Sequence, residues 1–167
     1  MVIKGDAAMQ IIGDWAKGEF PNAGKVPGAD YACIPVPKAN GKPGFVYLVN
    51  ALSLFTQTDP DKIKGQDVLA SAIMDKDVQV AFNKAKGAIP ARTDADMSGF
   101  DACAQATAAD LVAADAAGTA VPTFAGTHVA NATIVGAATD AITGFFNSAM
   151  TEKAGATALA DAIKAAK

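Results

Sequence analysis

The sequence changes character near residue 58, and this change limits the folds open to the chain. Before it, short apolar segments alternate with loops rich in glycine and proline; after it, apolar residues recur at the three- and four-residue spacing of a helix face. Alanine, the strongest helix former, fills 39 positions, of which 24 lie in residues 101–167. The pattern therefore predicts an α+β chain in which a small sheet is followed by a closely packed helical array.

Three segments of the first part are predicted strands, over residues 8–12, 31–37 and 45–55. Two prolines limit the second of them to a sheet edge or to the end of a strand. Residues 15–20 are predicted to form one or two helical turns between the first two strands.

Five helices are predicted after residue 58 from their capping residues and their apolar spacing. The first begins at Asp59, an N-cap that precedes a proline, and the second begins at Asp77 and ends near Gly87. Gly118 suits the position that follows the end of the third helix, and Thr151 caps the fifth. The last three helices are expected over residues 100–114, 134–146 and 151–163.

Composition and charge exclude several classes of protein. The chain has 167 residues and is 51% hydrophobic and 19% charged, which suits one folded domain. Its 17 acidic and 14 basic residues give a net charge of −3, so it lacks the basic excess of a nucleic-acid-binding protein. The longest charge-free stretch, residues 116–139, is too polar and too interrupted to span a bilayer. We therefore expect no nucleic-acid partner and no membrane insertion.

The first residues carry no signal-peptide pattern. A signal peptide would have a basic start followed by an apolar stretch, and residues 1–6, MVIKGD, do not follow that order. The chain as it stands is therefore expected in the cytoplasm, unless an export signal lies outside it.

Motifs for catalysis or for metal and cofactor binding are missing. Residues 18–25 look like a phosphate-binding loop, but five residues separate the glycines instead of four, and Val26 stands where a Ser or Thr is required. A hydrolase would have to pair Cys33 or Cys103 with His128, the only histidine. No Cys-x-x-Cys pair supports a zinc site. We therefore expect no enzyme activity, no cofactor and no metal.

The two cysteines have two possible states when only the residues are considered. They lie 70 positions apart, either as buried free thiols or as one disulfide formed in an oxidising compartment. A disulfide would close a long loop and stabilise the fold by roughly 4 kcal/mol on the chain-entropy model. Composition leaves both states open.

Three phrases of the sequence resemble one protein family. Residues 4–20, KGDAAMQIIGDWAKGEF, resemble the start of the C-terminal part of the extracellular solute-binding proteins of ABC sugar importers. Residues 83–92, NKAKGAIPAR, resemble the Lys-Gly-x-Ile-Pro-x-Arg segment of the glucose/mannose-type subgroup, and residues 100–105, FDACAQ, resemble another of its stretches. The phrases occur in the order of the family, and the resemblance covers essentially the whole chain.

The resemblance implies the type II periplasmic-binding-protein fold, an α/β fold of two lobes that close on a ligand by a hinge motion. Residues 1–48 and 95–167 would belong to the C-terminal lobe, and residues 52–90 would supply helices of the N-terminal lobe. The core of the N-terminal lobe and the signal peptide would lie upstream. The chain is therefore expected to be a single partial unit of that fold.

The resemblance also implies four ligand-binding residues. Trp15 stands where relatives often carry an aromatic side chain that stacks on a sugar, the alternative being a packing role. Asn50 replaces an aspartate of the hinge strand and keeps an acceptor, or else serves only as a hydrogen-bonding hinge residue. Lys86 resembles a lysine that contacts sugar hydroxyls, or else it complements the helix dipole. His128 lies two residues beyond the place of a family histidine, which indicates a loop change or a lost ligand.

The location and partners follow from the same resemblance. Relatives are periplasmic or extracellular, bind a sugar and deliver it to an ABC permease, and a glucose-like monosaccharide is the implied ligand. Some relatives carry paired cysteines in the corresponding segments, which favours a disulfide between Cys33 and Cys103.

Two functions remain as hypotheses. The first is the sugar-binding component of an ABC transporter, present as a C-terminal segment with weakened binding. The second is a stand-alone fold remnant that self-associates as a homo-oligomer, because orphaned sheet edges and apolar faces favour strand pairing between copies.

Overall fold

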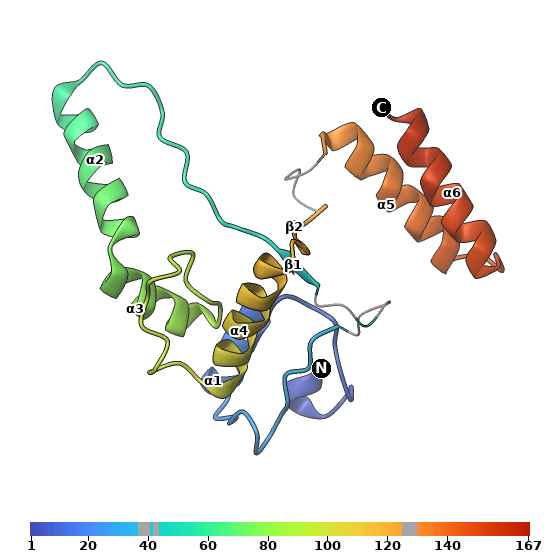
Figure 1. The fold of residues 1–167 in the computed structure, drawn as a ribbon, viewed down its shortest axis with the longest axis horizontal. Helices are drawn as coiled ribbons and strands as arrows, with labels where there is room; N and C mark the ends of the chain where they lie inside the picture. Colours follow the sequence, from blue (N-terminus) through green and yellow to red (C-terminus); the bar gives the residue numbers. More distant parts are fainter. Residues whose placement is uncertain (37–40, 42–43, 125–129) are drawn as a thin grey trace. The chain divides into compact units, whose positions relative to one another are not determined.

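The computed structural model describes residues 1–36, 41, 44–124 and 130–167. From the blue end to the red end of Figure 1, its elements are the 3-10 helices η1 (Val2–Lys4) and η2 (Asp14–Gly18), the helix α1 (Glu19–Asn22), the strand β1 (Phe45–Tyr47), the helices α2 (Pro60–Met74), α3 (Lys76–Lys86) and α4 (Ala102–Ala116), the strand β2 (Ala120–Pro122), and the helices α5 (Ala132–Phe146) and α6 (Glu152–Ala165). The prediction of a mixed α/β chain with a small sheet and several helices is confirmed.

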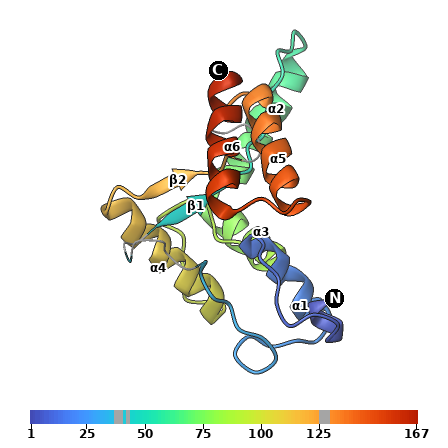
Figure 2. The ribbon, with the colours of Figure 1, turned by 90° about the vertical axis from the view of Figure 1, so that its right-hand side faces the viewer.

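The sheet consists of β1 and β2, which run side by side (Figure 2). The N–H of Phe45 donates to the carbonyl of Thr119 at 3.3 Å, and the N–H of Thr123 donates to the carbonyl of Tyr47 at 2.7 Å. Both strands advance in the same direction from the first bond to the second, so the pairing is parallel. The second strand was not predicted, because its three residues end in a proline and carry almost no pattern.

The predicted strands are mostly wrong. Residues 8–12 form no strand, and Met9 and Ile11 are 79% and 86% exposed. In the predicted strand 31–37, the described residues make only an isolated bridge, from Tyr31 to Pro27. Of the predicted strand 45–55, only β1 (Phe45–Tyr47) forms. The physical reason is that an apolar segment becomes a strand only beside a partner strand, and no described strand adjoins these segments.

The helix boundaries follow local capping chemistry. Asp59 caps α2 by accepting from the N–H of Asp61 at 2.9 Å, and Thr151 caps α6 by accepting from the N–H of Ala154 at 3.3 Å, as predicted. The predicted cap of α3 is wrong by two residues. Asp75, not Asp77, holds that position, because its carboxylate accepts the N–H groups of Asp77 and Val78.

The chain divides into two compact units. The first comprises residues 1–45 and 49–119, and the second comprises residues 46–48 and 120–167. In the first unit the aromatic side chain of Phe20 is buried and stacks on Tyr31 with ring centroids 4.3 Å apart. Phe100, Ala104 and Ala114 are also buried there. These buried apolar side chains thus lie in α1, in α4 and just before α4.

The corner between α2 and α3 is held by polar contacts to residues that follow α3. Gln79, buried in α3, donates to the carbonyl of Ile73 and accepts the backbone N–H of Arg92. The Arg92 guanidinium donates to the carbonyl of Met74 at 2.8 Å and pairs with Asp94, which holds the pKa of that carboxyl well below its usual range. These bonds fix the chain just beyond the Ile-Pro-Ala-Arg phrase against the helix corner.

The second unit contains the antiparallel helices α5 and α6, which lie side by side in both views (Figures 1 and 2). Gly155 is buried against the ring of Phe145, where the Cβ of any other residue would overlap ring carbons. The glycine therefore permits the close approach of the two helices. Of the helices in the described residues, none combines the length and the apolar character needed to cross a bilayer.

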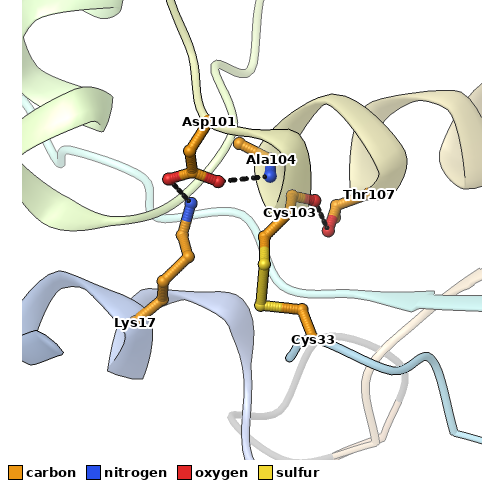
Figure 3. Close-up of a disulfide and its surroundings, with 6 residues drawn as sticks. All are labelled: Lys17, Cys33, Asp101, Cys103, Ala104 and Thr107. Carbon is orange, nitrogen blue, oxygen red and sulfur yellow. Dashed lines mark hydrogen bonds and ion pairs between the residues drawn. A yellow bond between two sulfur atoms is a disulfide. The ribbon is translucent and has the colours of Figure 1, made fainter. Parts of the chain in front are cut away.

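A disulfide joins Cys33 to Cys103 in the first unit, with their Cα atoms 5.6 Å apart (Figure 3). It links the segment after α1 to the first turn of α4, across a sequence separation of 70 residues. Crosslinks of this length remove considerable conformational entropy from the unfolded chain.

Replacing both cysteines by serine is expected to lower the free energy of unfolding of the first unit by about 4 kcal/mol. Trp15 is the only tryptophan and belongs to this unit, so its fluorescence during urea unfolding measures the change. Adding a reductant to the unsubstituted protein should lower the urea concentration at the unfolding midpoint. The same reductant should leave the midpoint of the double variant unchanged. Equal midpoints for the oxidised protein and the double variant would contradict the prediction.

Candidate functional site

Trp15 lies on η2 with its indole folded back over the chain. The ring covers Gly13, where a Cβ atom would overlap the six-membered ring of the indole. Because glycine leaves this space, the indole rests on the backbone while 44% of the residue stays exposed. The side chain therefore offers a flat apolar surface to a ligand and is not a core residue.

Lys86 is the last residue of α3, and Gly87 ends the helix in the left-handed region at φ 84°. The Lys86 ammonium lies 5.9 Å from the ring centroid of Phe82, one turn earlier. Lys84, in the same turn, lies instead over the ring of Phe100 at 5.4 Å. Among the ion pairs of the described residues none engages Lys86, so its ammonium remains available to a hydrogen-bond acceptor.

Two glycines bring these elements into direct backbone contact. A Cβ on Gly18 would lie 2.6 Å from the carbonyl oxygen of Lys86, and a Cβ on Gly87 would overlap the backbone nitrogen of Gly18. Only glycine at both positions permits η2 to lie this close to the end of α3. The structure thereby brings the elements that carry Trp15 and Lys86 together across 71 positions of sequence.

Asp14 is a polar member of this region that the sequence reasoning missed. It begins η2 and lies partly buried. Burial raises the pKa of the Asp14 carboxyl, and the nearby backbones of Ile89 and Trp15 and the charges of Lys17 and Lys86 only partly oppose the rise. Its place between glycine and the only tryptophan was the available signal.

A buried ion pair anchors η2 to α4 (Figure 3). The Lys17 ammonium is 2.6 Å from Oδ2 of Asp101, and the Lys17 side chain is only 8% exposed. Oδ1 of the same aspartate accepts the N–H of Ala104 at 2.9 Å and so caps α4. Burial raises the pKa of Asp101, but the Lys17 and Ala104 hydrogen bonds outweigh it, so the pKa lies below its usual range.

Of the other sequence-predicted ligand residues, Asn50 lies exposed in residues 48–59, a segment without helix or strand. His128 lies outside the described residues. Cys33 and Cys103 are joined to each other, so the oxidised protein has no free thiol there for the hydrolase hypothesis. The described residues gather no set of three metal-ligating side chains.

Replacing Asp101 by Asn is expected to lower the free energy of unfolding by roughly 1–3 kcal/mol, because the buried Lys17 ammonium loses its partner while the amide still caps α4. The same change at Asp59, an exposed cap of α2, keeps its capping bond and should cost less than about 0.5 kcal/mol. Chemical denaturation followed by Trp15 fluorescence and by circular dichroism measures both. Equal losses in the two variants would contradict a stabilising ion pair.

The Asp101 substitution also changes the pH dependence of stability. The folded pKa of Asp101 lies below its unfolded value, so its contribution is complete above the ordinary aspartate pKa of 3.8 and is lost as the pH falls below it. The asparagine variant should therefore lose less stability than the parent protein over that acidic range.

Replacing Gly18 by Ala is expected to destabilise the first unit by roughly 1–3 kcal/mol, because the new methyl group meets the Lys86 carbonyl. The backbone of Gly18 is in the right-handed helical region, so conformational strain does not contribute. Gly65→Ala in α2 is the matched control, since nothing lies near its Cβ position. That control should gain about 0.5–1 kcal/mol, and a similar gain for Gly18→Ala would contradict the close contact.

Comparison with known proteins gives a consistent result. No protein-family model matches the chain. A protein of Rhizobium meliloti named "Probable sugar-binding periplasmic protein" is 39% identical over 167 residues, which is 100% of this chain and 40% of the relative. A protein of the same name from Brucella suis is 38% identical over 167 residues, with 100% of this chain and 39% of the relative covered.

A more distant relative extends the comparison. An uncharacterized ABC transporter extracellular-binding protein of Pyrococcus horikoshii is 36% identical over 104 residues, which cover 60% of this chain and 22% of the relative. The chain thus spans about two fifths of the length of the curated relatives that it matches throughout. Along its whole length the chain is similar to a part of proteins named as periplasmic sugar-binding proteins, and over 60% of its length it is similar to a protein named as an ABC transporter extracellular-binding protein.

Proposed function

We propose that the chain supplies one side of a sugar-binding site in a solute-binding protein that serves an ABC permease. The names of the relatives support a periplasmic sugar-binding role. Trp15 and Lys86 were expected as ligand contacts, and the elements that carry them touch at Gly18 and Gly87. The backbone contact between the element of a half-exposed indole and the element of an ammonium that has no ion pair among the described residues is the observation that carries the proposal.

The chemistry of these side chains suits a sugar. A pyranose has one face of C–H groups, which an indole covers, and a rim of hydroxyl groups, which ammonium and carboxylate groups bind. Trp15 provides the apolar surface, and Lys86 donates to hydroxyl oxygens. We infer a monosaccharide of the glucose type as the ligand, on the strength of the resemblance of residues 83–92 to the glucose/mannose-type subgroup.

The remaining site residues and the lobes belong to the same proposal. Residues 1–48 and 95–167 form part of one lobe and residues 52–90 part of the other, and Asn50 lies at the crossing between them. His128, which the resemblance implies as a further sugar contact, lies outside the described residues. Because the chain spans about 40% of its relatives, it provides only part of the enclosing surface, and its affinity alone is expected to be weak. A disulfide is compatible with a periplasmic location.

A thermal melt with hexoses and disaccharides at millimolar concentration tests the proposal. A ligand that binds only the folded state raises the midpoint by mass action. We expect a reproducible increase with one hexose, and Trp15→Ala should abolish it because the stacking surface is lost.

Phe55→Ala is the matched control, since it removes a 74% exposed aromatic side chain outside the site and should keep the sugar-dependent shift. A shift that survives Trp15→Ala would place the ligand elsewhere. No shift with any sugar would contradict binding by this chain.

Self-association is the second candidate function. Large apolar side chains are exposed along the segment after β1, which forms no helix or strand, among them Leu52 at 62% and Phe55 at 74%. Exposed apolar segments favour association between copies. Sedimentation across a range of protein concentrations discriminates between the two candidate functions. A protein that stays monomeric at all concentrations would exclude self-association.

A further inference from the structure

We propose that the hairpin of α5 and α6 is an interaction surface, and that its partner is the same hairpin of a second copy of this chain, so that two copies pair as a four-helix bundle. The inference rests on self-association, the second candidate function, and assigns the contact to the second unit instead of the segment after β1. It is independent of sugar binding, because Trp15 belongs to the first unit.

Helix α5 is more apolar than the cover that α6 gives it. Asp140 is the only charged residue in its 15 residues, and Ala138 is the one residue of the helix that is buried in the described structure. Ile142 remains 45% exposed and Phe146 remains 79% exposed. A helix with so little charge is normally packed on most of its sides, so the hairpin has an apolar face that a further partner would bury.

This face carries both an open groove and a protruding ring. The groove lies between the two helices, has a volume of about 330 Å³ and is lined mainly by apolar residues, which include Ile142, Phe145 and Phe146 of α5 and Gly155, Ala156 and Leu159 of α6. Phe145 lies against Gly155, and the Phe146 ring meets it edge-on with the ring centroids 5.5 Å apart. The most exposed ring thus stands beside a groove whose other side is formed by small residues.

A second copy suits this face because the face is complementary to itself. In a two-fold dimer each copy presents the same surface, so the Phe146 ring of each copy can fill the groove of the other. Charge does not oppose the contact: residues 120–167 carry three acidic and three basic side chains, whereas the rest of the chain carries the whole net charge of −3. Of the described residues that line the groove, Glu152 alone is charged.

The face has the size of a small interface. A 15-residue helix is about 22 Å long and packed helices lie about 10 Å apart, so the hairpin face measures roughly 20 by 20 Å. Two such faces amount to roughly 800 Å² in projection and to more in accessible surface, which approaches the roughly 1,200 Å² of specific interfaces. The dimer is therefore expected to be weak and reversible, and to form as the protein concentration rises.

Sedimentation equilibrium of the full chain, from micromolar to millimolar concentration, tests the inference. The unsubstituted protein should change from monomer to dimer and form no larger species, because a two-fold contact closes on itself. Phe146→Ala should weaken dimerisation roughly tenfold or more, since the inserted ring is lost. Ile142→Glu should abolish dimerisation, because it brings two further carboxylates into a groove that already holds Glu152 of each copy.

Two control variants separate this surface from others. Thr143→Glu adds the same charge at an exposed position of α5 outside the groove, and Phe55→Ala removes an exposed ring from the segment after β1. Both should keep the dissociation constant of the unsubstituted protein, and circular dichroism should show the same helix content in all four variants. Equal effects of Ile142→Glu and Thr143→Glu would contradict a contact through the groove.

The remaining outcomes distinguish the inference from the functions proposed above. A monomer at every concentration overturns the inference together with the second candidate function, and would leave the groove to a partner of another kind. Association that survives Phe146→Ala and Ile142→Glu but is lost in Phe55→Ala overturns the inference alone. Phe146→Ala should keep any sugar-dependent rise of the thermal midpoint, so a failure of sugar binding is measured separately.

Discussion

The buried contact between Lys17 and Asp101 is the interaction on which the first unit depends. A lysine ammonium with 8% of its side chain exposed would destabilise the fold if it had no partner, so η2 must stay against the start of α4. Asp101 also caps α4, and the disulfide at Cys103 joins the first turn of α4 to the segment after α1. The N-terminal end of α4 is therefore held by an ion pair, a capping hydrogen bond and a disulfide.

This anchoring explains how a short 3-10 helix can hold Trp15, the proposed stacking residue, in place. An isolated helix as short as η2 is unstable in water, and its position comes entirely from its neighbours. The Lys17 ammonium fixes it to α4, and the glycine contact of Gly18 with Gly87 fixes it to α3. Trp15 comes just before these attachments in the chain, and its indole lies against Gly13 while nearly half of the residue remains exposed.

The parts of the structure that local chemistry determines could be predicted from the sequence. Caps such as Asp59 and Thr151 bind N–H groups two or three residues away, so the sequence nearby contains all that is needed. The pairing of β1 with β2 joins segments more than 70 positions apart, and short apolar runs do not indicate their partners. In the site, the resemblance selected Trp15 and Lys86, whereas the contact of Gly18 with the backbone of Lys86 and Gly87 joins segments far apart in the sequence and only the fold brings them together.

The site is held by polar and covalent links more than by apolar burial. No large side chain among the described residues is fully buried, and Gln79, Asn83 and Lys17 lie among the most buried positions. Hydrophobic packing changes little with pH or redox state, but ion pairs, carboxylate hydrogen bonds and disulfides respond to both. A site built on such links keeps its geometry only where the carboxylates are ionised and the cysteines are oxidised. A periplasmic compartment is oxidising and therefore meets the second of these conditions, which connects the proposed location to the physical basis of the proposed site.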